Sequence, residues 1–281
     1  MKLALLRRKR YKAKLPGFGL TLGLSMTYMT LLILVPLSAL ALYAAKISLG
    51  DFVKIIFSER TAAAFKVSFL SSFQAAFFNF LAGLVIAWVL TRYNFFGKKF
   101  LDALIDLPFA IPTSVAGISL AVIFSANGAI GGILQKFGIE IAYSRGGIVI
   151  ALIFIGFPFV VRTVQPVIEE LDKEVEEAAS CLGANYYQIF ARVIFPSLFP
   201  ALLTGFTLAF ARGLGEYGSI IFISSNMPYE SEIVPLLIVK QLLQFNYEGA
   251  SAIGVSLLVC AFALLFCINL LQNISKRGRA K

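Results

Sequence analysis

The chain has 281 residues, of which 59% are hydrophobic and only 14% charged, whereas a soluble domain carries roughly 25% charged residues. Its mean hydropathy of +0.84 and its apolar runs of about 20 residues or more are typical of helices that cross a bilayer. It contains no histidine, which excludes Ser-His-Asp hydrolysis and HExxH zinc hydrolysis because both need an imidazole. We therefore expect an all-α integral membrane protein.

The net charge of +10 does not indicate nucleic-acid binding, because the basic residues gather next to the first apolar run. Seven of them precede residue 15: Lys2, Arg7, Arg8, Lys9, Arg10, Lys12 and Lys14. The apolar run that follows, 20–45, is longer than the roughly 7–15 residues of a signal-peptide core. We expect an uncleaved first membrane span, although the small residues Ala39-Leu40-Ala41 leave cleavage open.

Six apolar segments predict six transmembrane helices in one domain that covers residues 1–281. They lie at 20–45, 61–90, 101–126, 146–166, 201–224 and 249–272. A further stretch, 233–239, is too short to span and leaves a re-entrant segment open. The two chain ends and the loops on their side carry 16 Lys and Arg residues, against 6 in the other loops. The positive-inside rule therefore places both ends and the 167–200 loop in the cytoplasm.

The cytoplasmic segment 169–200 has the pattern of two short helices joined at an angle. Apolar residues recur in its first half at helical spacing, with glutamates between them: Leu171, Val175, Ala178 and Leu182. Gly183 provides a C-terminal stop. Asn185 and Gln188 form a capping box for the second helix, which we expect Pro196 to end. Such an elbow suits the docking of a partner protein, with an ordinary interfacial helix pair as the alternative.

This segment resembles the EAA loop of the permeases of ABC importers. Glu177-Ala178-Ala179, Gly183 and Pro196 match the family's pattern of E-A-A, three residues, G, nine residues and I-x-L-P. Val193 and Phe195 stand where that pattern has Ile and Leu, which keeps its apolar character. The resemblance implies the type I importer fold, with six transmembrane helices and a cytoplasmic coupling elbow.

Four longer strings are similar to the sulfate/thiosulfate permeases of this family: 106–112, 154–166, 211–219 and 232–239. The similarity extends over about residues 20–272 and implies the permease subunit of an ATP-driven sulfate/thiosulfate importer. Molybdate permeases share the EAA loop and a similar Gly-Glu-aromatic-Gly segment, so a molybdate or tungstate permease stays open. A membrane-embedded enzyme and a passive anion channel are the alternatives from other classes.

The resemblance also implies partners. Two ATPase subunits would dock on Glu177, Ala178, Ala179, Gly183 and Pro196, and a second related permease and an external sulfate-binding protein would complete the complex in the membrane lipid. The chain has no G-x-x-x-x-G-K-[ST] loop for nucleotide phosphates, so we expect ATP hydrolysis on separate subunits. We expect no enzymatic activity, cofactor or metal in this chain. We expect the chain to lie in the bacterial cytoplasmic (inner) membrane or in a chloroplast envelope membrane.

Two charged residues, Arg212 and Glu216, lie inside the fifth apolar run, where charges are costly and rare. If that helix begins near Ala201, Arg212 lies about 17 Å along it, near the middle of a core roughly 30 Å thick. Arg212 would then offer a positive charge to an anion on the substrate pathway. The alternative is a structural salt bridge with Glu216, four residues away. Glycines around the pair favour the pathway hypothesis.

Charges nearer the ends of the apolar runs have simpler explanations. We expect Lys66 and Arg162 to reach the interface with their long side chains. Asp102 and Asp106 open the third segment, where the N-terminus of a helix favours negative charge.

The loop charges predict that cysteines introduced at residues 2 and 281 react with a membrane-impermeant maleimide only from the cytoplasmic side. An even number of spans returns the chain to the side from which it started. Labelling of right-side-out and inside-out vesicles measures this, in a chain without Cys181, Cys260 and Cys267. Reaction from opposite sides would mean an odd number of spans.

Overall fold

The structure, a computed structural model, describes residues 17–279, so the basic cluster expected before the first span lies outside the described residues. The described residues form only helices, turns and loops. In chain order the helical elements are α1 (Phe18–Met29), η1 (Thr30–Leu34), α2 (Val35–Ala44), α3 (Leu49–Ile56), α4 (Glu59–Arg92), α5 (Lys98–Ile105), α6 (Leu107–Ala110), α7 (Thr113–Phe124), α8 (Gly131–Gln135), α9 (Arg145–Glu169), α10 (Lys173–Cys181), α11 (Tyr186–Ile189), η2 (Phe190–Ile194), α12 (Phe195–Leu214), α13 (Ile220–Ile223), α14 (Val234–Leu243) and α15 (Tyr247–Arg279).

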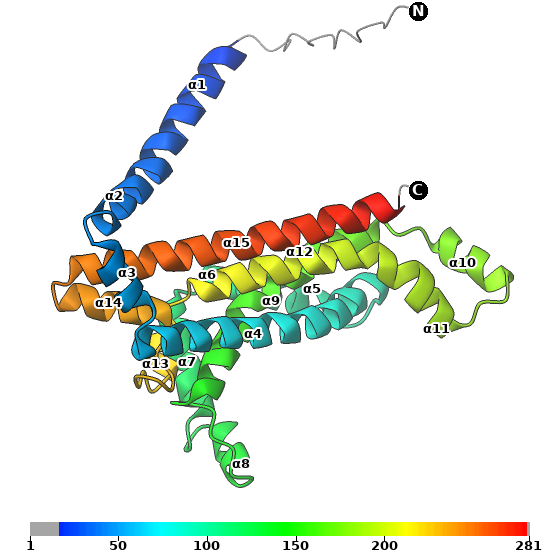
Figure 1. The fold of residues 1–281 in the computed structure, drawn as a ribbon. Helices are drawn as coiled ribbons and strands as arrows, with labels where there is room; N and C mark the ends of the chain where they lie inside the picture. The colour runs from blue at the N-terminus through cyan, green and yellow to red at the C-terminus, as the bar shows by residue number, and fades with distance from the viewer. Residues whose placement is uncertain (1–16, 280–281) are drawn as a thin grey trace, which may run out of the picture.

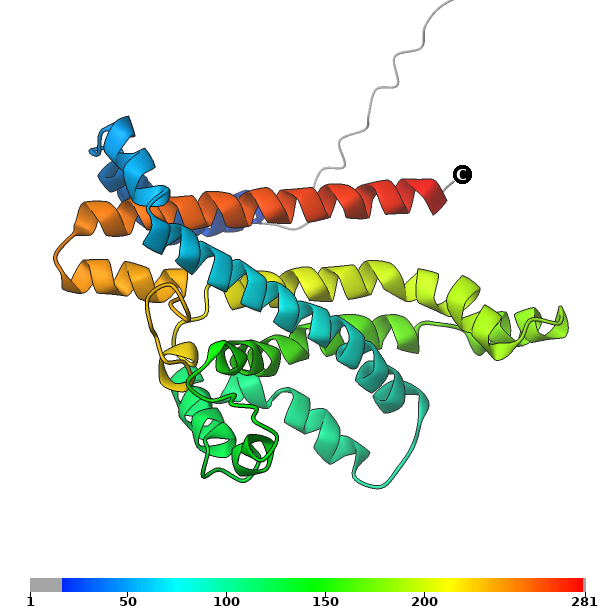
Figure 2. The same ribbon diagram turned by 60° about the horizontal axis from the view of Figure 1, so that its bottom comes forward.

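Five helices of the described chain are long and apolar enough to cross a membrane, and they confirm five of the six predicted spans. Among them α4, α9 and α12 pack against one another, and α15 packs against α12, α14 and α2. Figure 1 shows α10 and α11 at one end of this bundle and α3 and α14 at the other, with α1 leading away from it. The short apolar stretch 233–239 contributes to α14, which lies beside α15 (Figure 2).

The third predicted span is helical but is not one continuous helix. The segment divides into α5, α6 and α7, with breaks at Asp106 and at Ile111-Pro112. Ile111 has extended backbone, with φ of −89° and ψ of 133°, which is the conformation that a following proline favours. Pro112 also lacks the N–H that would continue the helix. The tertiary structure must therefore hold three short helices in place of one long one.

One arginine of α9 fixes this broken segment. Arg162 donates hydrogen bonds to both carboxylate oxygens of Asp106, at 2.8 and 2.6 Å. It also donates to Asp102 Oδ1 and to Gln165 Oε1, each at 2.7 Å. The prediction that a helix N-terminus accounts for the two aspartates is wrong for Asp102, which lies inside α5 because that helix begins at Lys98, whereas Asp106 is the N-cap residue of α6. Arg162 is likewise held in a network between helices rather than extended alone to the interface.

Two of the prolines that lie in long helices without ending them follow π-helical turns. The π-helical turns η1 and η2 come directly before Val35-Pro36 and Phe195-Pro196. A π-helical turn gives room for the proline ring and accommodates its missing backbone hydrogen bond. The prediction that Pro196 ends the second helix of the elbow is therefore wrong. Instead α11, η2 and α12 form one helix from Tyr186 to Leu214.

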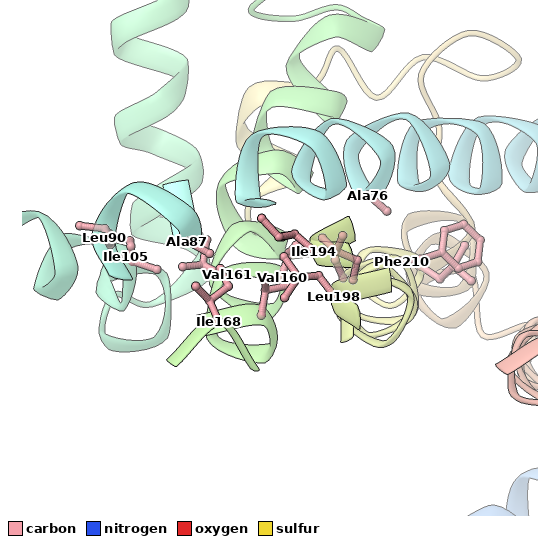
Figure 3. Packing of buried hydrophobic residues seen from close by; sticks show 14 of the residues in the cluster. Ala76, Ala87, Leu90, Ile105, Val160, Val161, Ile168, Ile194, Leu198 and Phe210 are labelled. Carbon is pink, nitrogen blue, oxygen red and sulfur yellow. The ribbon is translucent and has the colours of Figure 1, made fainter. Parts of the chain in front are cut away.

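The core lies where α4, α9 and α12 meet. Val160 of α9 is fully buried in a notch formed by one glycine on each neighbouring helix. A Cβ at Gly83 of α4 would lie 2.7 Å from Val160 Cγ1, and one at Gly205 of α12 would lie 2.8 Å from Val160 Cα. Figure 3 shows Val160 among apolar side chains of the same cluster, with Ala76 and Leu198 from those neighbours. Small residues of this kind let membrane helices approach closely.

A buried carboxylate holds α4 and α14 together at the end of the bundle away from α10 and α11. The sequence analysis did not identify it. Glu232, in the loop before α14, is 1% exposed. It accepts hydrogen bonds from Arg60 Nε and Nη2, at 2.7 and 2.8 Å, and from Lys240 Nζ at 2.6 Å. Burial raises the pKa of Glu232, but the hydrogen bonds from Arg60 and Lys240 outweigh it, so that this pKa lies below its usual value.

We expect Glu232→Gln to lower the free energy of unfolding by about 2 kcal/mol at pH 7, because it removes hydrogen bonds between charged groups. The pKa of Glu232 in the folded state lies below the unfolded value of about 4.3. Its stabilisation is therefore present above that pH and is lost as the pH falls through the folded-state pKa. Thermal unfolding midpoints measured from pH 7 downward should fall less steeply below about pH 4.3 in the variant than in the unchanged protein. The exposed Glu230→Gln is the matched control, and equal stability of the two variants at pH 7 would contradict this role.

Candidate functional site

The elbow turns at a glycine in the left-handed conformation. Gly183 has a φ of +85°, which residues with a Cβ rarely adopt. Its N–H donates to the carbonyl of Ser180 at 2.9 Å, and the N–H of Ala184 donates to the carbonyl of Ala179 at 3.1 Å. These two bonds form a Schellman motif, which ends a helix and redirects the chain. The predicted stop at Gly183 is confirmed.

The second helix of the elbow begins with the predicted capping box, which is also confirmed. The N–H of Gln188 donates to Asn185 Oδ1 at 2.9 Å, and the N–H of Asn185 donates to Gln188 Oε1 at 3.0 Å. The turn between the two helices is therefore defined by local hydrogen bonds on both sides of Ala184. Local sequence alone was sufficient to predict it.

An ion pair that the sequence analysis missed ties the elbow to the bundle. Arg92, the last residue of α4, donates to Glu176 Oε1 at 2.6 Å and to the carbonyl of Leu171 at 3.3 Å. Its guanidinium lies 5.2 Å from the centre of the Trp88 ring. The signal that could have found it is an arginine directly after the second apolar run. The pair Arg92–Glu176 holds α10 against the end of α4.

The apolar side chains predicted to line one face of the elbow lie largely open. Leu182 is 90% exposed and Tyr186 is 94% exposed, and Val175 is exposed as well. We call these three residues the elbow surface. Figure 1 shows the elbow beyond the end of the bundle, so this surface is not part of the bundle's packing. Large apolar side chains left exposed on one short segment suit a protein interaction site.

The five residues predicted to dock the ATPase all lie on or next to this elbow. Three of them are exposed and two are half-buried: Glu177, Ala178, Gly183, Ala179 and Pro196. Ala179 packs against the core cluster, so it helps to seat α10 on the bundle. Contact of all five with an ATPase stays a prediction.

The structure brings Arg212 and Glu216 together. Arg212 Nη1 lies 2.7 Å from Glu216 Oε2. Glu216 is 2% exposed, and its other oxygen accepts hydrogen bonds from the N–H and the hydroxyl of Ser219, at 2.9 and 3.0 Å. The salt bridge weighed as the structural alternative is therefore present. It leaves the guanidinium partly exposed, so the geometry also permits an anion to approach it.

The depth of Arg212 in the membrane cannot be counted from the start of its helix. Its helix begins at Tyr186, not near Ala201, so a count from the helix start no longer places Arg212 in the middle. A Cβ at the neighbouring Gly213 would lie 3.1 Å from Ser72 Oγ of α4. Ser72 lies about 20 Å along α4, a helix about 51 Å long. Arg212 is therefore still at the level of the middle part of a span.

The family profile described as binding-protein-dependent transport system inner membrane component matches residues 79–281. The chain is 49% identical over 259 residues to the sulfate transport system permease protein CysT of Escherichia coli (strain K12). The matched region covers 92% of this chain and 94% of that protein. It is 44% identical over 253 residues to the probable sulfate transport system permease protein cysT of Chlorokybus atmophyticus, covering 90% and 88%.

A solved structure shares the fold. A chain of a bacterial alginate ABC transporter, in complex with an alginate pentasaccharide-bound periplasmic protein, matches with a TM-score of 0.77 and 20% identity and covers 92% of this chain and 94% of that one. At this identity the likeness shows the fold alone. The family profile and the near-complete match to the relatives show more: the chain belongs to the family of binding-protein-dependent transport system inner membrane components, multi-pass membrane permeases whose role is transport and not catalysis.

Proposed function

We propose that the chain is the permease subunit that translocates sulfate or thiosulfate in an ATP-driven importer. The observation that carries the coupling role is the elbow, whose exposed Leu182 and Tyr186 stand on helices tied to the bundle by Arg92. The choice of sulfate rests on the relatives, which are named as sulfate transport permeases. Import of a divalent anion against an inside-negative potential costs about 4.6 kcal/mol per 100 mV, and coupling to ATP hydrolysis would supply it.

The proposed complex contains two ATPase subunits, a second related permease and an external sulfate-binding protein. The ATPase would receive the elbow surface together with Glu177, Ala178, Ala179, Gly183 and Pro196. The second permease is supported by the apolar residues that α4 leaves exposed, among them Phe73, Phe77 and Leu81. Lipid covers whatever part of this face the second permease does not.

The experiment that tests the proposal is ATP-dependent uptake of radiolabelled sulfate by the reconstituted complex, with thiosulfate and molybdate as competitors. Competition by thiosulfate and not by molybdate is expected. Uptake of molybdate in preference to sulfate would contradict the substrate and support the molybdate alternative. Sulfate flux without ATP would contradict the importer and support a passive channel.

Substitution of Gly183 tests the elbow. Valine cannot adopt a φ of +85° without strain of about 1–2 kcal/mol, whereas asparagine tolerates the left-handed region. We expect Gly183→Val to reduce ATP-driven uptake several-fold at normal membrane insertion, because the angle between α10 and α11 changes. Gly183→Asn is the matched control. Full uptake by the valine variant would argue against a coupling role for this turn.

Arg212→Gln separates the pathway and structural hypotheses. If Arg212 faces the path of the anion, the complex assembles and binds ATP normally, but uptake falls roughly tenfold, the effect of about 1.4 kcal/mol, and adding Glu216→Gln does not restore it. If the pair is only structural, the single change leaves a buried carboxylate unpaired, and the double change recovers assembly. We expect the first result. Arg192→Gln, at an exposed position on the same long helix, is the control, and restored uptake in the double variant would contradict the pathway role.

A further inference from the structure

A polar cavity lies between the first parts of α4 and α9, at the end of these helices away from the elbow. Its volume is about 240 Å³, and its lining includes Lys66, Ser71, Gln74 and Arg145. Since one water occupies about 30 Å³ in the liquid, the cavity has room for a small tetrahedral anion and several waters. The side chains of Lys66, Gln74 and Arg145 are exposed, so the cavity is open on one side.

Ser71 lines this cavity with a hydroxyl that has no protein partner. The residue as a whole is 4% exposed, and its hydroxyl makes no hydrogen bond with any residue in 17–279. Ser68, one turn earlier, differs because its hydroxyl accepts the N–H of Val234 at 2.8 Å. The hydroxyl of Ser71 is not among the buried atoms that lack a partner, so it is open to the cavity. Ser71 therefore offers a free hydrogen-bond donor to whatever enters the cavity, water or an anion.

Lys66 and Gln74 lie on one face of α4, two turns and about 12 Å apart. Lys66 makes no ion pair with any described residue, and the side chain of Gln74 makes no hydrogen bond with any described side chain or backbone group. An unpaired ammonium facing hydrocarbon would be costly, which is why such residues usually face water-filled cavities. This face of α4 therefore suits a hydrated path that leads from the outer end of the helix towards its middle.

Arg145 is the first residue of α9, where a positive charge opposes the helix dipole. The structure holds it there, because Nε donates to the carbonyl of Glu230 and Nη2 donates to that of Tyr229 at 3.2 Å. Both acceptors are neutral, so the positive charge of Arg145 is not cancelled by them. The start of α9 and the two cations together favour a negative charge in the cavity.

We propose that this cavity binds the transported oxyanion, with Lys66 and Arg145 supplying charge and Ser71 and Gln74 supplying hydrogen bonds. The inference rests on the proposed function. It assigns to the transported anion a first binding site within the permease, on the outer side. Sulfate is doubly charged and has four acceptor oxygens, which two cations and two neutral donors complement. The site also revises the expectation that Lys66 merely reaches the interface.

The electrostatic field of the cavity can be measured without transport. Leu70, which lines the cavity between Lys66 and Gln74, is replaced by Cys in the full complex, in a chain whose Cys181, Cys260 and Cys267 are Ser. The measured quantity is the rate of modification by a negatively charged methanethiosulfonate divided by the rate for a positively charged one. We expect Lys66→Gln to lower this ratio at least about tenfold, the effect of removing one nearby charge. A Cys at the exposed Leu49 is the control and should not respond.

Occupancy is tested on the same Leu70→Cys complex with sulfate alone as the probe. We expect sulfate, compared with gluconate at equal ionic strength, to slow the modification in vesicles of phosphatidylcholine. Slowing by anionic lipid but not by sulfate would overturn the proposal in favour of a lipid headgroup site. A rate that neither responds to sulfate nor changes with Lys66→Gln would overturn it as well.

Uptake then shows whether the site lies on the pathway. We expect Lys66→Gln and Arg145→Gln to raise the KM for sulfate uptake several-fold, Lys66→Arg to restore it, and the exposed Lys54→Gln to leave it unchanged. An unchanged KM in both cavity variants would overturn the proposal. If the unsubstituted complex takes up no sulfate, the proposed function fails, while the modification ratio still decides whether the cavity attracts anions.

Discussion

The close packing of Val160 between Gly83 and Gly205 is the contact on which the rest of the structure depends. It brings α12 at Gly205 close to the backbone of α9 and α4 at Gly83 close to the Val160 side chain, and such packing replaces the hydrophobic driving force that helices lack in lipid. A second close contact lies one turn away on α9, where Gly156 leaves room for Asn79 of α4. The Asn79 amide donates to the carbonyl of Ile153 at 3.1 Å. The elbow and the polar cavity are attached to opposite ends of these same helices.

Charge compensation follows a clear pattern around this core. Arg162 is neutralised by two aspartates, Glu232 by two cations, and Arg212 by Glu216. Each of these networks joins separate elements or fixes one to its neighbour, because a buried charge is tolerated only with a partner. Lys66 differs from them, since it has no ionic partner among the described residues. That contrast is why the cavity beside it is more informative than the charged pairs.

A single helix connects the two functional ends. α4 begins beside Glu232, carries Lys66 and Gln74 along one face, and ends at Arg92, which holds the elbow through Glu176. The axial distance from Lys66 to Arg92 is about 39 Å. The helix that holds the elbow is therefore the same helix that lines the cavity. This arrangement offers a short physical connection between the proposed ATPase-docking site and the proposed anion site.

The sequence by itself determined the features that depend on local chemistry. Hydropathy located five of the long helices, and the positive φ at Gly183 and the capping box at Asn185 followed from side chains acting on their own backbone. The sequence also showed which family the EAA segment resembles. These features need no knowledge of what lies far away in the chain.

Only the tertiary structure decided the rest, because it depends on residues distant in sequence. The break at Ile111-Pro112 has a local cause in the proline, but hydropathy could not show how the three short helices are held, since Arg162 lies 56 residues after Asp106. Nor could it pair Glu232 with Arg60, which lies 172 residues earlier. Pro196 was read as a helix end because a widened π-helical turn has no local sequence signal. The partners of each charge, and the cavity that leaves Lys66 without one, exist only once the helices have packed.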